Sequence, residues 1–87
     1  MLLNFFRRTN STMKVFGYSK ISDTLLELKE VSIQCNLEDL DKIISFLQEV
    51  NNKHSNINCD VDLCHSHFRD WDKKWNNDSS DIIIVTN

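Results

Sequence analysis

Segment 36–54 constrains the fold most, because the apolar residues of NLEDLDKIISFLQEVNNKH recur with the period of an α-helix. Asn36 is a favoured N-cap residue, and the acidic residues of the first turn suit the positive end of the helix dipole. Helix propensity fades over residues 51–54, so we expect the helix to end there. The apolar stripe consists of Leu40, Ile43, Ile44, Leu47 and Val50, widened by Leu37 and Phe46. Such a stripe has to be covered by another element.

Four β-prone runs flank this helix in the chain, at residues 13–18, 24–35, 58–71 and 81–87. The last run is apolar on both faces, which is typical of a well-covered strand. The element order is therefore β-β-α-β-β. We predict an α+β fold in which the helix packs on one face of a mostly antiparallel, four-stranded sheet. The other face of that sheet is expected to be partly exposed to water or covered by a partner.

The run at 24–35 changes the face on which its apolar residues lie. Leu26 and Leu28 share one parity, whereas Val31 and Ile33 share the opposite one. A strand can keep one face buried across such a slip only if it contains an extra residue. We therefore predict a β-bulge or a strong bend near residues 29–30.

Eighty-seven residues suffice for one small domain of modest stability. We expect this domain to span residues 13–87, with residues 1–12 forming a tail, an extra strand or a leader upstream of Met13. The chain has no proline and one glycine, so Asn, Asp and Ser must build its turns. No apolar run approaches the roughly 20 residues that a membrane span requires, so we predict no membrane partner. The net charge of −3 argues against a nucleic-acid partner, which usually demands a basic surface.

The three cysteines, Cys35, Cys59 and Cys64, are odd in number and form no CxxC pair. This usage fits a reducing cytoplasm better than a disulfide framework, and it leaves room for one bridge. We expect Cys35 and Cys64 to be small core residues, because cysteine is among the most often buried residue types.

The stretch HSHFRDWDKKW, residues 65–75, contains the candidate chemistry. His65 and His67 lie two apart on a predicted strand, so they share a face and could ligate one metal ion. Spacing supplies no third ligand, so a metal site is the alternative hypothesis, and we predict no cofactor. Cys64 would face away from His65, so a Cys–His nucleophile is not favoured and we predict no enzymatic activity.

The charges around this stretch favour a protein partner. Residues 60–81 carry six Asp against three basic residues, a balance that attracts a basic surface. Trp and Arg are frequent anchors of protein interfaces, although either Trp could equally pack in the core, and the Asp and Asn residues could serve only as turn formers in a solvated loop. The predicted partner-binding residues are Asp62, His65, His67, Arg69, Asp70, Trp71, Asp72 and Trp75.

An opening LELKEVSI strand, an amphipathic helix, HSHFRDW and a closing DIIIV together resemble the immunity protein 32 family of bacterial polymorphic toxin systems. The resemblance covers about residues 25–85, and its distinctive parts are His65-x-His67, Asp70, Trp75 and residues 81–85. It implies a cytoplasmic, non-catalytic antidote that binds a cognate toxin domain. A homodimeric structural domain is a further alternative, since a four-stranded sheet has two free edges.

Overall fold

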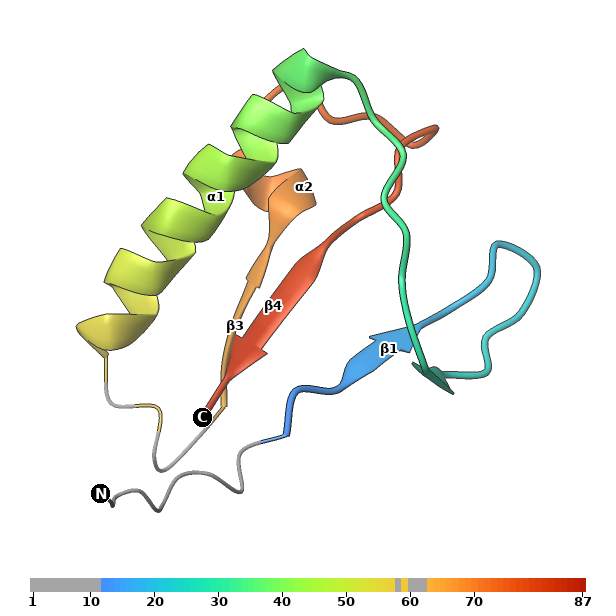
Figure 1. The fold of residues 1–87 in the computed structure, drawn as a ribbon, viewed down its shortest axis with the longest axis horizontal. Helices are drawn as coiled ribbons and strands as arrows, with labels where there is room; N and C mark the ends of the chain where they lie inside the picture. The colour runs from blue at the N-terminus through green and yellow to red at the C-terminus, as the bar shows by residue number, and fades with distance from the viewer. Residues whose placement is uncertain (1–11, 58, 60–62) are drawn as a thin grey trace, which may run out of the picture. The chain divides into compact units, whose positions relative to one another are not determined.

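The computed structural model describes residues 12–57, 59 and 63–87, and the chain divides into two compact units, Met1–Gln34 and Cys35–Asn87 (Figure 1). In the first unit, β1 (Val15–Gly17) pairs antiparallel with β2 (Leu26–Leu28). In the connection between the two strands, the hydroxyls of Ser19 and Ser22 accept hydrogen bonds from backbone N–H groups two residues ahead. The turn is thus built by serine side chains, as the scarcity of glycine and proline predicts.

The predicted strand at 24–35 is much shorter than expected. The chain bends at Lys29, immediately after β2, which confirms the predicted bend near residues 29–30. Beyond the bend, Val31 and Ile33 are exposed and lie in no strand. Cys35 is also exposed, so its expected place in the core is wrong. The parity slip ends the strand here, because no bulge restores its pairing.

The second unit contains β3 (Cys64–His67), β4 (Ile83–Thr86) and two helices, α1 (Leu37–Ser55) and α2 (Phe68–Trp71). The Asn36 side chain caps α1 by accepting a hydrogen bond from the Asp39 N–H at 2.8 Å, as predicted. Figure 1 shows α1 alongside the β3–β4 hairpin. Within the described part of the chain, no helix combines the length and the apolar character that a bilayer crossing requires.

The protein is a small α+β structure with one main helix, but its strands form two separate two-stranded sheets. The predicted single four-stranded sheet is therefore wrong. Each strand has only three or four residues, so it offers few ladder hydrogen bonds to a further neighbour. Among the described residues, the hydrophobic core cluster includes none of β1 or β2.

The core of the second unit centres on Phe46, whose ring is 1% exposed and meets Phe68 edge to face at 5.3 Å. Val50 completes the buried cluster. Partly buried side chains pack around it: Ile43, Trp71, Trp75, Ile82 and Ile84. The predicted stripe on α1 is shifted, because its members Leu40, Ile44 and Leu47 are exposed. The buried face instead passes through residues 43, 46, 50 and 54, since the aromatic residues of α2 pack against Phe46.

Candidate partner-binding surface

Strand β3 presents alternate side chains to its two faces, as the sequence predicts. Its register pairs Ser66 with Ile84 of the core cluster, so Ser66 lies on the face that α1 covers. His65 and His67 pair with Val85 and Ile83 on the opposite face. Exposed side chains on that face include His65, Ile83 and Val85, the last two being 49% and 54% exposed. Both histidines therefore share the face of this hairpin that α1 leaves uncovered.

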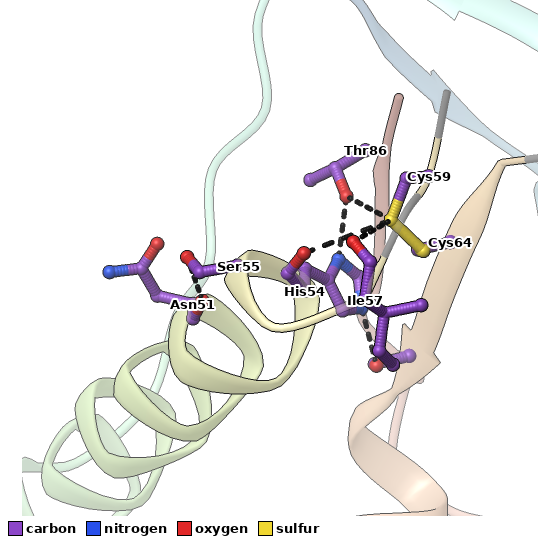
Figure 2. The surroundings of a disulfide bond; sticks show 8 residues. Asn51, His54, Ser55, Ile57, Cys59, Cys64 and Thr86 are labelled. Atoms are coloured by element: carbon purple, nitrogen blue, oxygen red, sulfur yellow. Dashed lines mark hydrogen bonds between the residues drawn. A yellow bond between two sulfur atoms is a disulfide. The ribbon is translucent and has the colours of Figure 1, made fainter.

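His54 fixes the C-terminal end of α1 to the covered face of the hairpin (Figure 2). Its ring nitrogens lie 2.7 Å from the Thr86 hydroxyl and 2.9 Å from the Ser66 hydroxyl. These contacts of His54 were not predicted from the sequence. A signal for them was available, because His54 lies four residues after Val50 and continues the buried face of the helix.

Cys59 and Cys64 form a disulfide beside this contact (Figure 2). The Cys59 sulfur also lies 3.9 Å from the Thr86 hydroxyl, and Cys59 is buried. The bridge closes a short loop, because the two cysteines are five positions apart. Cys64 is therefore bonded to Cys59 and is not the free cysteine of an apolar core that the sequence predicts. Its sulfur carries no thiol group, which a nucleophilic cysteine needs.

Asp81 ties the start of β4 to the junction between β3 and α2. Its carboxylate accepts hydrogen bonds from the backbone N–H groups of Arg69 and Ile82, both at 2.9 Å, and lies 2.7 Å from His67 Nδ1. Partial burial raises the pKa of Asp81. The hydrogen bonds from His67, Arg69 and Ile82, with the charge of His67, outweigh that effect and hold the pKa below its usual value. The distinctive residues His67 and Asp81 thus serve as an internal clamp.

Both tryptophans pack against the core, which answers the question that the sequence left open. The Trp71 ring stacks on Phe68 at 5.7 Å, and its Nε1 donates a hydrogen bond to Glu49. The Trp75 Nε1 donates to the Ser80 carbonyl oxygen at 3.1 Å. Their polar ends are therefore satisfied within the chain, and their rings contribute to folding rather than standing free.

The charged side chains at the start of α2 differ in how firmly they are held. Arg69 and Asp70 are 51% and 74% exposed, and the 3.8 Å separation of Arg69 Nε from the Asp70 carboxylate is a weak surface pair. The Asp72 side chain is only 15% exposed. Its carboxylate lies 3.8 Å from Lys42 Nζ and accepts a hydrogen bond from the backbone N–H of Lys74. Asp70 is therefore available to a partner, whereas Asp72 is already engaged.

The described members of the predicted partner-binding set lie on β3, on α2 and just after α2, and only some of them are accessible. Its exposed members are His65, Arg69 and Asp70. Its other described members are held by internal contacts: His67, Trp71, Asp72 and Trp75. Asp62 lies outside the described residues.

An open cavity of about 410 Å³ lies between α1 and the β3–α2 segment. Phe46, Val50 and Trp71 supply its apolar surface. Polar side chains complete the lining: Glu49, Lys53, Ser66, His67 and Asp70. Because the lining contains no β4 residue, the cavity borders β3 on the side away from its strand partner.

Among the residues that the structure describes, no third ligand joins His65 and His67 at the alternative metal site. The rings of His65 and His67 are 5.7 Å apart and lie nearly perpendicular. His67 is already engaged by Asp81. Across residues 12–57, 59 and 63–87, no group of three or more His, Cys, Asp or Glu side chains is arranged to hold a metal ion.

No protein family, curated protein or solved structure matches the chain. The likeness to the immunity protein 32 family therefore stays a resemblance carried by the residues named above.

Proposed function

We propose that this chain is a non-catalytic bacterial immunity protein that binds and neutralises a cognate toxin domain with a basic surface. The observation that carries the proposal is the charge of the second unit. Residues 35–87 contain ten acidic and five basic side chains, a net charge of −5, whereas residues 1–34 contain three acidic and five basic ones. A surface of this sign attracts a basic protein and repels nucleic acid.

The exposed groups at the β3–α2 junction suit such a partner. The carboxylate of Asp70 is exposed, and its pair with Arg69 is weak. Beside it, the uncovered face of the hairpin offers apolar area from Ile83 and Val85 together with the polar ring of His65. Apolar area flanked by charge is the usual composition of a protein interface.

Co-expression tests this proposal directly. The chain should relieve the growth arrest caused by the toxin domain encoded beside its own gene, and the two proteins should co-purify. Asp70→Lys should weaken the complex about tenfold or more, and the affinity of the unaltered complex should fall as salt rises. Trp75→Ala is unsuitable as a test, because Trp75 packs against the core.

Asp78→Lys is the matched control, because Asp78 is exposed in the 76–80 turn and undergoes the same change of charge. It should bind the toxin domain almost as well as the unaltered chain. Equal loss in both variants would show that only overall charge matters, and full binding by Asp70→Lys would remove Asp70 from the interface. Failure of the chain to relieve that toxin would refute the proposed function.

A further inference from the structure

Among the described residues, one edge of strand β3 pairs with β4 and the other, called the free edge below, pairs with no strand. The polar backbone groups of the free edge can be assigned from the register. The Phe68 N–H donates to the Ile82 carbonyl oxygen at 2.8 Å, one step beyond the His67–Ile83 pair. Hydrogen-bonded and non-hydrogen-bonded pairs alternate in an antiparallel ladder. The Ser66–Ile84 pair is therefore hydrogen-bonded, whereas His65 and His67 direct their backbone groups away from β4.

These outward groups remain unused within the described part of the chain. The His67 carbonyl begins the hydrogen-bond pattern of α2 as its N-cap residue. The N–H and C=O of His65 and the N–H of His67 have no backbone partner among the described residues. An unpaired row of this kind is a template for one more strand.

The 410 Å³ cavity described above borders the same edge. Its apolar surface, from Phe46, Val50 and Trp71, can receive one side chain of an added strand. The carboxylates of Glu49 and Asp70 lie on its lining and outnumber the ammonium group of Lys53, which favours a neighbouring Lys or Arg. Backbone pairing supplies affinity in such strand addition, and side-chain pockets supply specificity.

We propose that an extended segment of the basic toxin domain pairs with the free edge of β3, places an apolar side chain in this cavity and directs a Lys or Arg to Asp70. The inference rests on the proposed function and names the binding mode of that site. A second copy of this chain is a poorer occupant, because two units with a net charge of −5 each repel one another.

The test measures amide hydrogen exchange in the full chain, alone and in complex with the toxin domain encoded beside its gene. In the free chain, the His65 and His67 amides should exchange rapidly, whereas the Ser66 amide, which faces β4, should be protected. In the complex, the His65 and His67 amides should become protected at least about tenfold. A complex that leaves both amides exchanging freely overturns the inference and leaves the proposed function standing.

Proline substitution separates the two edges of the hairpin. His65→Pro removes an outward N–H of β3 without breaking the ladder to β4, and it should weaken toxin binding about tenfold. Val85→Pro makes the same backbone change on the outer edge of β4, and His65→Ala removes the ring but keeps the backbone N–H. Because both variants alter only side-chain area of the proposed surface and leave the outward N–H groups of β3 intact, both should weaken binding clearly less than His65→Pro. The reverse ranking of the two proline variants overturns the inference.

Two further outcomes are decisive. Should His65→Pro lose the far-ultraviolet circular dichroism of the fold, the exchange measurement on the unaltered chain decides alone. Protection of the His65 amide in the chain by itself, rising with its concentration, would assign the edge to a second copy and overturn the inference. Absence of any complex or growth relief refutes the proposed function instead.

Discussion

Replacing Phe46 with alanine should strongly destabilise the second unit. The Phe46 side chain is 1% exposed and contacts both Phe68 and Trp71. Truncating a buried Phe costs about 3–5 kcal/mol, because apolar burial is lost and a cavity remains. A unit of this size has a free energy of unfolding of roughly 3–8 kcal/mol. The single change therefore removes from roughly 40% to all of the stability.

Leu47→Ala is the matched control, since Leu47 is the neighbouring residue of the same helix and is 41% exposed. Alanine also has the higher helix propensity, so the cost should stay below about 1 kcal/mol. Phe46→Leu, which keeps most of the apolar volume, should fall between the two.

Urea unfolding followed by tryptophan fluorescence and by circular dichroism at 222 nm measures all three variants. The fluorescence probe is well placed, because Trp71 lies 5.8 Å from the Phe46 ring. A cost for Leu47→Ala equal to that of Phe46→Ala would refute the reasoning. That result would mean that the stripe predicted from the sequence, and not the face centred on Phe46, is the buried one.

Two further changes test the clamp and the disulfide. Asp81→Asn should cost about 1.5–3 kcal/mol at pH 7, because it removes a charged acceptor from three donors. The pKa of Asp81 in the folded chain lies below its ordinary value, so the carboxylate stabilises the fold above about pH 4 and this stabilisation is lost as the pH falls through the lowered pKa. The urea midpoints of the unaltered chain and of Asp81→Asn should therefore converge in acid. Reducing the Cys59–Cys64 bridge should cost about 2 kcal/mol, the value expected for so short a loop. Unfolding with and without reductant measures it, and Cys35→Ser, which alters an exposed free thiol, should leave that difference unchanged.

Local features of the helix were predictable from the sequence. The Asn36 cap forms as expected because it needs only the Asp39 N–H, three residues away. The buried face was not predictable, because apolar residues cover about half of the helix circumference and periodicity alone cannot choose among them. The choice is made by Phe68, which reaches Phe46 from another element. The contact between Phe68 and Phe46, and not the apolar pattern of the helix, determines which face of α1 is buried.

In the candidate surface too, the sequence predicts local features but not those that depend on distant contacts. Alternation along β3 placed His65 and His67 on one face, since it depends only on the strand period. The strand predicted over 58–71, of which residues 58 and 60–62 lie outside the described ones, instead gives way to a helical turn at Phe68. The carboxylate of Asp81 accepts the Arg69 N–H of that turn from twelve positions away. A short-range pattern contains no information about so distant an acceptor.

The placement of the tryptophans changes where binding energy should come from. The sequence favoured Trp71 and Trp75 as interface anchors because exposed Trp is so often one. Both rings instead stabilise the core that holds β3 and α2 in place. A partner then meets the exposed Asp70 carboxylate, the free backbone of His65 and the apolar wall of the cavity. Mutating a Trp would abolish binding through loss of the fold, whereas mutating Asp70 would change association rate and salt dependence with the fold intact. Measuring association rates on variants shown to be folded therefore distinguishes a residue that contacts the partner from one that only stabilises the fold. A screen that records only loss of binding cannot make this distinction.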